Sequence, residues 1–290
     1  MMYPFLPVRR NGKLLFPCGT FTGTYNHHEL RFAVSLGYRI HDVEEQLIYT
    51  ETWRPFDTWV DDLYERRLAL QKIGSKQESV IKNLLVSIYG KFAQQAVTDA
   101  KFIEKDDFSV EDLKTYDTHD ILHDDVVVCE RESGYDPVFS FPILSSYITG
   151  YARILMYDYI VRGEALYTDT DSIITFKPLE DVTTIGRMKL EQTITDGVVV
   201  RPKLYRVDDH VRSKGFRRLD KEGFEKILHG EPISIVRWAK LRESLRRDLV
   251  VLQDLEVLKK ASLEDDKRVW KTLFNEHELQ KSEPLVLNEW

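Results

Sequence analysis

Two carboxylates, Asp169 and Asp171, lie one residue apart in the strand-forming run ALYTDTDSIIT, residues 165–175. Side chains alternate along a strand, so these two anions would share one face and repel each other unless a cation lay between them. A bound cation would remove the repulsion. Thr-Asp-Thr-Asp is also good turn chemistry, because short polar side chains bond their own backbone, so a solvated hairpin tip without a ligand is the alternative.

A second group of candidate residues lies in KNLLVSIYGKF, residues 82–92. Offsets of four and seven return to the same side of a helix, so Lys82, Val86 and Tyr89 are expected on one face. An ammonium group binds phosphate as a point charge, and a tyrosine ring offers a surface on which a base pair can stack. The alternative is an amphipathic core helix in which Lys82 extends to solvent and Tyr89 is buried.

The elements that must position these residues can be predicted from apolar spacing and turn residues. Residues 5–16 favour two short strands around an Asn-Gly turn, and residues 28–36 favour a helix. From Phe56 onward the spacing predicts a helical hairpin that is interrupted at Gly74 and Ser75.

The carboxylates are predicted to follow a long helix. This helix contains FPILSSYITGYARILMYDYIV and ends at Gly163. A helix near residues 181–195, a strand pair in VVVRPKLYRV and DHVRSKGF, and a charged helical tail from Asp220 onward are expected next. Together these elements predict an α+β fold in which helices surround a small mixed or antiparallel sheet.

Composition places the chain among globular proteins that form one large or two ordinary domains. It has 290 residues, of which 42% are hydrophobic. No run approaches the roughly eighteen apolar residues of a membrane helix, and the first residues lack the apolar core of a signal peptide, so we expect a cytoplasmic protein without membrane contact. Cys18 and Cys129 are too few and too isolated for a disulfide framework, and no Cys/His cluster has zinc-site spacing.

The net charge of -7 is distributed unevenly along the chain. Residues 99–136 hold thirteen Asp/Glu against four Lys/Arg and lack strong periodicity, so a partly ordered acidic insertion is expected there. Residues 201–247 hold fourteen Lys/Arg against seven Asp/Glu. A polyanion would contact the basic segment and avoid the acidic one.

The order of these motifs resembles the polymerase module of family B DNA polymerases. In that family a fingers helix with the pattern KxxxNSxYG precedes a YxDTDS hairpin in the palm, as KNLLVSIYGKF precedes YTDTDS here. KLY at 203–205 is similar to the family's KxY element, and KGF at 214–216 to the basic turn that follows it. LPVRRNGKLLFPCGTFTG and HELRFAVSLGYRI resemble the compact organellar, plasmid and viral branch, which includes protein-primed enzymes.

The resemblance implies DNA-directed DNA polymerase activity and a role for each candidate residue. Asp169 and Asp171 would hold Mg2+ or Mn2+ against the phosphates of a deoxynucleoside triphosphate, and two such ions stabilise both oxygens of an in-line displacement. Lys82 would neutralise charge on the triphosphate, with Ser87 and Tyr89 also at the nucleotide site. The DNA primer-template would be contacted by three residues of the basic segment, Lys203, Tyr205 and Lys214.

The family pattern also implies a domain organisation. A palm with an antiparallel sheet would comprise residues 1–56 and 93–200, with the acidic insertion at about 99–136 inside it. Fingers helices would span residues 57–92, and a mostly helical thumb or C-terminal region would span residues 201–290.

Two features depart from the family pattern. Val86 stands where the family has Asn, and an apolar side chain cannot make the hydrogen bonds of an amide. The upstream DxxSLYP motif, which supplies a further palm carboxylate, does not occur, although Met2-Tyr3-Pro4 resembles its tail. We therefore expect that the chain starts beyond this motif and beyond the proofreading exonuclease domain, as the C-terminal part of a polymerase.

Three interpretations remain open. In the first, the chain is a polymerase subunit or fragment that is active only when a second polypeptide, carrying the N-terminal polymerase and exonuclease part, supplies the missing carboxylate. In the second, motivated by Val86 and the missing carboxylate, it is a non-catalytic DNA-binding or scaffolding protein derived from a polymerase, although keeping two repelling anions together argues against this. In the third, another acid such as Asp42 or Asp57 is the third metal ligand.

Overall fold

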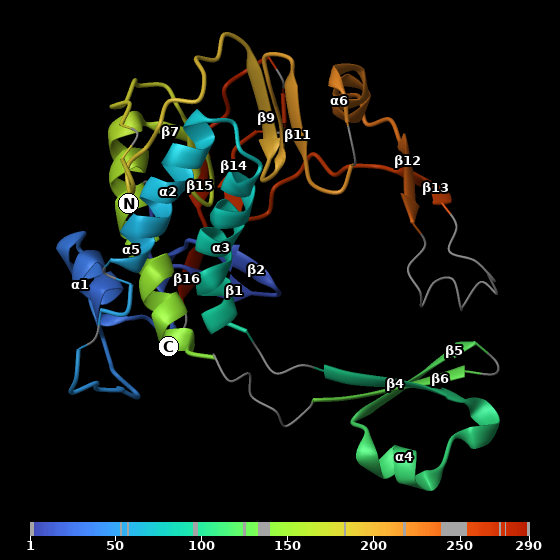
Figure 1. Ribbon diagram of the computed structural model, residues 1–290. Coiled ribbons are helices and arrows are strands. Elements are labelled where there is room, and N and C mark those ends of the chain that lie inside the picture. Colours follow the sequence, from blue (N-terminus) through green and yellow to red (C-terminus); the bar gives the residue numbers. More distant parts are fainter. Residues whose placement is uncertain are drawn as a thin grey trace. The chain divides into compact units, whose positions relative to one another are not determined.

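The computed structural model describes most of the chain (Figure 1). The described residues are 3–52, 54–56, 58–94, 98–123, 126–132, 140–182, 184–216, 219–238, 254–272, 274–275 and 277–288. The chain divides into two compact units. The first comprises residues 1–94, 138–191 and 286–290, and the second comprises residues 95–137 and 192–285.

The first unit opens with the hairpin that the sequence predicts. β1 (Val8–Arg10) and β2 (Lys13–Leu15) pair antiparallel. Asn11 and Gly12, between them, both have positive φ, which is the backbone geometry that favours Asn-Gly in a two-residue turn. The expected hairpin is therefore confirmed.

Two helices form the centre of the first unit. α1 (His27–Ser35) begins at Asn26, whose side chain accepts a hydrogen bond from the backbone of Glu29. α5 (Pro142–Gly163) begins with proline in its first turn, and both helices agree with those expected from apolar spacing. The apolar core around them contains Phe5, Leu6 and Ala33, packed by Phe21, Tyr25, Phe32, Leu36, Tyr38, Ile154 and Tyr157.

The helical hairpin expected after Phe56 is confirmed. α2 (Trp59–Lys72) and α3 (Gln77–Phe92) pack together, and α3 also contacts α5. The side chain of Arg67 bonds that of Glu78 across the hairpin at 2.6 Å. No residue of α2 or α3 is buried in the described structure, so much of their surface is available to a ligand.

A buried polar junction joins α1 to α5. Glu29 is 1% exposed, and its carboxylate accepts hydrogen bonds from Arg153 at 2.6 and 2.9 Å and from Asn26 at 2.7 Å. Asn26 also donates to the backbone oxygen of Ser146 at 3.1 Å. Because a buried carboxylate without partners is costly, these bonds hold the two helices in one register. Burial and, after it, this carboxylate raise the pKa of Tyr25 to about 12.

Gly150 allows the close approach of α1 and α5 at this junction. A Cβ atom there would lie 2.5 Å from Asn26 Nδ2 and 3.0 Å from the side chain of Glu29, which are both buried. We expect Gly150→Ala to destabilise the fold by about 2 kcal/mol, because neither neighbour can move without breaking its hydrogen bonds. Chemical denaturation measures the change. Gly90→Ala in α3 is the matched control, since a Cβ there meets nothing within 4 Å; an equal loss in both variants would contradict this account.

β7 (Ala165–Asp169) and β8 (Ser172–Thr175) follow α5 as the predicted antiparallel hairpin. They pair only with each other among the described strands, so a larger palm-type sheet is not seen there. The helix expected near residues 181–195 is wrong, because the described residues of that range form no helix. β-branched residues and Gly186, which has positive φ, interrupt the apolar spacing there.

The acidic insertion in the second unit is more regular than expected. β4 (Thr98–Glu104), β5 (Thr118–His123) and β6 (Val126–Glu132) form an antiparallel sheet in the order β4-β6-β5. The short helices η1 (Lys105–Asp107) and α4 (Val110–Thr115) connect β4 to β5. The core contains Ile103, Val127 and Cys129, with Phe108 and Tyr116 packed against it. The described residues of this segment thus form a regular sheet around the buried apolar run of β6. Residues 124, 125 and 133–136 of the segment lie outside the described residues.

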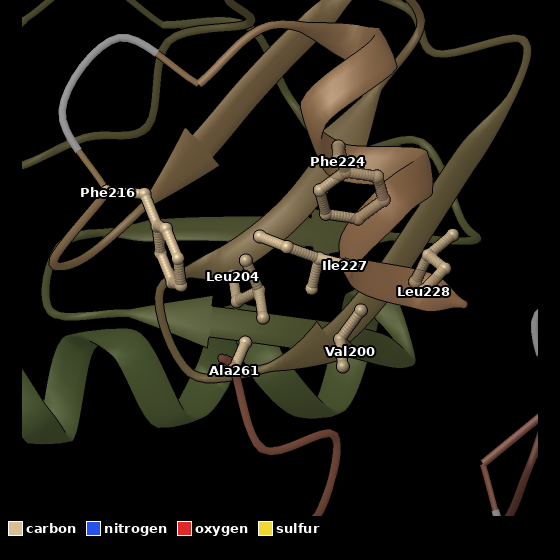
Figure 2. Packing of buried hydrophobic residues seen from close by; sticks show 7 residues of the cluster. All are labelled: Val200, Leu204, Phe216, Phe224, Ile227, Leu228 and Ala261. Atoms are coloured by element: carbon tan, nitrogen blue, oxygen red, sulfur yellow. The ribbon is translucent and has the colours of Figure 1, made fainter. Parts of the chain in front are cut away.

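A second antiparallel sheet contains β9 (Gly197–Arg201), β10 (Leu204–Val207) and β11 (His210–Ser213), in the order β11-β10-β9. The pairing of VVVRPKLYRV with DHVRSKGF is confirmed by β10 and β11. The first of these segments was expected to be one strand, however, and a turn at residues 202–203 divides it into β9 and β10. α6 (Lys221–Leu228) packs on this sheet and begins at Asp220, whose side chain caps it. Figure 2 shows the core between them, which contains Val200, Leu204, Phe216, Phe224, Ile227, Leu228 and Ala261.

The chain beyond α6 is rich in strands, so the mostly helical character expected for residues 201–290 is wrong for the described residues. The described elements there are β12 (Ile233–Trp238), β13 (Asp254–Lys259), β14 (Arg268–Trp270), β15 (Ser282–Pro284) and β16 (Val286–Asn288). β12 and β13 alternate between half-buried and exposed residues and pair antiparallel, as a period of two requires. The charged residues 239–253, which contributed to the helical interpretation, lie outside the described residues.

The remaining described strands form two pairs. β14 pairs antiparallel with β15, and β16 pairs in parallel with β3 (Cys18–Thr20), which joins the end of the chain to the first unit. The described helices and small, mainly antiparallel sheets agree with the predicted α+β class. Within the described part of the chain, no helix combines the length and the apolar content that crossing a membrane requires.

Candidate functional site

The tip of the β7–β8 hairpin contains both predicted metal ligands. Asp169 is the last residue of β7, whereas Asp171 lies in the turn, so strand alternation does not apply to Asp171. The turn brings the backbones of the two residues together: Thr170 has a φ of 59°, and the Asp171 N–H donates to the Asp169 backbone oxygen at 2.7 Å. Ser172 Oγ donates to the same oxygen at 3.1 Å, which further fixes the turn. Asp169 is half-buried and Asp171 is exposed.

Two carboxylates at an accessible hairpin tip suit a hard divalent cation, because Mg2+ is usually bound by one or two carboxylates together with substrate oxygens. In the part of the chain that the structure describes, no three His, Cys, Asp or Glu residues come together to hold an ion. Asp42 instead accepts a hydrogen bond from the backbone of Val43 at 2.8 Å. Asp57 lies outside the described residues. The tip therefore fits one part of a metal site that needs a further ligand.

α3 presents the predicted nucleotide-contact face to solvent. Lys82 is exposed, Val86 is 51% exposed and Tyr89 is 37% exposed. The alternative in which Tyr89 is a buried core residue is therefore wrong. Ser87 Oγ donates to the backbone oxygen of Leu84 at 3.3 Å, a common arrangement for serine inside a helix. One exposed surface thus combines a cation, an aromatic ring and an apolar side chain.

In the second unit, the predicted DNA contacts lie at one end of the β9–β11 sheet. Lys203 is in the β9–β10 turn with a φ of 59°, and its backbone oxygen accepts a hydrogen bond from Lys214 N at 2.7 Å. Tyr205 pairs with Arg212 across the strands. As directly paired residues, Tyr205 and Arg212 have side chains on one face of the sheet, and Lys203 and Lys214 are joined by the backbone hydrogen bond at its end. These four residues are here called the basic face.

Two cations of this region are not among the predicted DNA contacts. Arg212 is exposed on the basic face. The sequence could have indicated it, because Arg212 lies only two residues before Lys214. Lys259 donates to the backbone oxygen of Gly215 at 2.9 Å and lies 5.0 Å from the ring centre of Phe216. No local pattern reveals Lys259, because β13 reaches this turn only in the folded chain.

The sequence of the chain, including α3, is similar to those of known proteins. A family model described as DNA polymerase type B, organellar and viral, matches residues 1–137. A probable DNA polymerase of Podospora anserina is 29% identical over 238 residues, which cover 69% of this chain. The resemblance to organellar and viral type B DNA polymerases is confirmed.

The chain spans only a small part of the length of the proteins that it matches, and only 20% of the Podospora anserina protein. A DNA polymerase of Kluyveromyces lactis is 28% identical over 194 residues, which cover 60% of this chain and 19% of that protein. A probable DNA polymerase of Ascobolus immersus is 29% identical over 204 residues, covering 65% of this chain and 16% of that protein. No solved structure matches the chain significantly.

We propose that the basic face binds duplex DNA, so charge reversal there should weaken this binding. Lys203→Glu is expected to lower the affinity for a primer-template about tenfold and to flatten its dependence on salt, because fewer counterions are released. Fluorescence anisotropy with a labelled duplex at several salt concentrations measures both effects. Lys226→Glu on α6 is the control, since Lys226 is exposed and paired with Glu222. A larger effect from reversals within residues 99–136 would place the duplex on the insertion instead.

Proposed function

We propose that this chain carries the nucleotidyl-transfer site of a DNA-directed DNA polymerase. The observation that carries the proposal is the β7–β8 tip, where a hydrogen-bonded turn presents Asp169 and Asp171 together within YTDTDS. The exposed α3 face with Lys82 and Tyr89 precedes it along the chain, in the order of the family motifs. The test is template-dependent nucleotide incorporation by the assembled enzyme, compared with its Asp169→Asn variant.

In the proposed reaction, the primer 3′ hydroxyl oxygen forms a bond to the α-phosphorus of a deoxynucleoside triphosphate, and the bond from that phosphorus to pyrophosphate breaks. Mg2+ or Mn2+ at the tip would supply electrostatic stabilisation of the attacking and leaving oxygens. Asp169 and Asp171 would hold the metal. The turn bonds restrict the backbone between these carboxylates, so little reorganisation is needed as charge develops.

The nucleotide would be bound by the exposed face of α3. The Lys82 ammonium would neutralise charge on the mobile triphosphate, and the Tyr89 ring would pack on the nascent base pair. Ser87 lies between them on the same helix. Val86 gives this face an apolar contact where the family has an amide, so base-pair packing here would depend on shape rather than on a side-chain hydrogen bond.

Removing the Lys82 charge should act on nucleotide binding. Lys82→Ala is expected to raise the apparent KM for the nucleotide about tenfold and to leave duplex affinity nearly unchanged, because a charge-assisted phosphate contact is lost. Steady-state incorporation at varied nucleotide concentration measures it. Lys91→Ala is the matched control, because Lys91 lies nine residues further on, at the opposite side of α3, and bonds Gln94. An unchanged KM with weakened duplex binding would make Lys82 a DNA contact instead.

We assign the polymerase subdomains on this basis. Residues 57–92 would be the fingers, residues 1–56 and 93–200 the palm, and residues 201–290 the thumb region. The basic face of Lys203, Tyr205, Arg212 and Lys214 would hold the primer-template. Its cations and one aromatic side chain suit a phosphate backbone, because phosphate neutralisation dominates sequence-independent affinity.

The metal site would be completed by a carboxylate from further polymerase polypeptide, whether this precedes residue 1 in a longer chain or is a second subunit. One observation in support is that, among the described residues, no third His, Cys, Asp or Glu joins Asp169 and Asp171 to hold an ion. Another is the segment of residues 40–49, which contains no helix or strand and exposes large apolar side chains to extents of 52% to 75%. Exposed apolar surface of this kind is normally covered by another polypeptide segment. The exposed side chains are Ile40, Val43, Leu47, Ile48 and Tyr49.

A second candidate function is non-catalytic DNA binding or scaffolding by a polymerase-derived protein. The observation that favours it is the exposed Val86, which removes an amide from the nucleotide face. The adjacent carboxylates at the β7–β8 tip oppose it, since their repulsion has no use without a cation. Duplex binding without any metal-dependent incorporation, in an assembly that contains the missing carboxylate, would establish the second function.

A further inference from the structure

Four aromatic rings gather where the first turn of α1 meets α5. They belong to His27, His28, Tyr147 and Tyr151, here called the ring cluster. The ring centres of His27 and His28 are 3.9 Å apart, and those of His28 and Tyr151 are 4.8 Å apart. His27 Nδ1 and the Tyr147 hydroxyl form a hydrogen bond at 2.8 Å. The rings therefore form one continuous group.

The ring cluster is held by a rigid frame. Tyr147 and Tyr151 are four residues apart, so they lie on one side of α5, and Gly150 beside them allows α1 to approach closely. The buried bonds between Glu29 and Arg153 fix the same two helices. Because the rings are ordered before any ligand arrives, binding to them costs little side-chain entropy.

The ring cluster is not part of the apolar core. Tyr151 is 52% exposed, His27 is exposed, and His28 and Tyr147 are half-buried. Tyr157, further along the same helix, is in contrast packed edge-on against the core. A group of rings that only stabilised the junction between α1 and α5 would be covered as Tyr157 is, whereas Tyr151 and His27 are exposed to solvent.

The chemistry of the ring cluster suits the flat faces of unpaired bases. Partial burial and then the neighbouring His27 and Arg31 lower the pKa of His28, which favours a neutral imidazole with an uncharged π face. Arg31, one turn along α1, is exposed and available to a phosphate. Aromatic rings beside a cation are the combination by which proteins bind single strands. A duplex hides its base faces, so stacking here requires unpaired bases.

We propose that the ring cluster binds single-stranded DNA by stacking its unpaired bases on Tyr151, whose ring is held in place by His28. That this strand is the template rests on the proposed polymerase function, whereas the stacking itself does not. The binding separates into two physical parts: ring stacking depends on the bases, and contacts to phosphate depend only on the backbone.

The experiment compares two labelled oligonucleotides of equal length and charge, a single-stranded thymidine homopolymer and an abasic strand, binding to the full chain. Wild type should bind the homopolymer about tenfold more tightly than the abasic strand. Tyr151→Ala and His28→Ala should lose most of this difference without changing affinity for the abasic strand, and Tyr151→Phe should retain it. Phe102→Ala is the matched control, since Phe102 is 45% exposed and belongs to the second unit.

Equal binding of the two strands by wild type, or an unchanged preference in Tyr151→Ala, would overturn the proposal. Asp169→Asn should keep the full preference for bases, because the hairpin tip takes no part in stacking. A preference that survives in Asp169→Asn, together with undiminished incorporation by that variant, would refute the metal site while leaving the ring cluster supported. Loss of the preference in Phe102→Ala would also count against the ring cluster.

Discussion

Asn in place of Asp169 or Asp171 should reduce nucleotide incorporation by the assembled enzyme about a thousandfold or more, with the fold intact. Metal stabilisation of the transferring phosphoryl group contributes several kcal/mol, and each 1.4 kcal/mol is a factor of ten in rate. Asn preserves the size and shape of the side chain but carries no charge, so it binds Mg2+ poorly. Primer extension at increasing Mg2+ and Mn2+ concentrations measures the loss.

Asp158→Asn is the matched control for these variants. Asp158 is an exposed carboxylate on α5, paired with Arg162 at 2.8 Å, and has no part in the hairpin tip. Its variant should extend a primer as wild type does. Circular dichroism should be unchanged in all three proteins. Asp171 is exposed, the backbone oxygen of Asp169 accepts two of the turn bonds, and an Asn amide oxygen could still accept the bond that Thr170 Oγ1 donates to the Asp169 carboxylate at 3.3 Å. Full activity in both tip variants would refute the metal assignment.

The parts of the fold that local sequence determines could be predicted. Asn11-Gly12 specifies the first hairpin because both residues tolerate positive φ, and the apolar spacing specifies α1, α2, α3 and α5. The β7–β8 hairpin follows from turn residues between two apolar runs. Its tip shows the limit of such reasoning: strand alternation predicts both carboxylates on one strand face, whereas Asp171 lies in a turn that follows β7, with Thr170 at positive φ.

The remaining features depend on contacts between distant residues. Lys259 reaches the turn after β11 from β13, and the ring cluster joins residues 120 positions apart in the chain. Neither arrangement leaves a local pattern. The strands beyond α6 were missed for a different reason: charged residues dominate that region, and the alternation of ISIVRW and DLEVLK is only visible over six residues each. The same reason applies to the acidic insertion: its many charged residues suggest a segment without regular structure, although the apolar run of β6 within it is buried.

The chain alone should not extend a primer, and extension should appear when a polymerase polypeptide bearing DxxSLYP is supplied. In the proposed site, two metal ions would carry four positive charges, and two carboxylates with a triphosphate would leave it without a protein ligand that bridges and spaces the ions. The described residues offer no third ligand. Primer extension with Mg2+, by the chain alone and after addition of the upstream polypeptide, measures the gain.

The control is the same upstream polypeptide with the Asp of its DxxSLYP motif changed to Asn. It should still bind the chain, since the exposed apolar segment 40–49 would be covered in either case, but it should not restore extension. Hydrogen exchange of residues 40–49 distinguishes association of the two polypeptides from restored activity. Association should slow this exchange whether or not the metal site is complete.

Robust extension by a pure monomer of this chain would refute the requirement for a further polypeptide. The third ligand would then have to come from the chain itself, and the choice would lie between Asp42 and Asp57. Asp42 already accepts a bond from the neighbouring backbone in an exposed segment, so it would have to break that bond and move to the hairpin tip. Asp57 lies just before α2, at a position outside the described residues. In that case the third ligand would be the acid, Asp42 or Asp57 or a neighbour, whose Asn variant abolishes the extension.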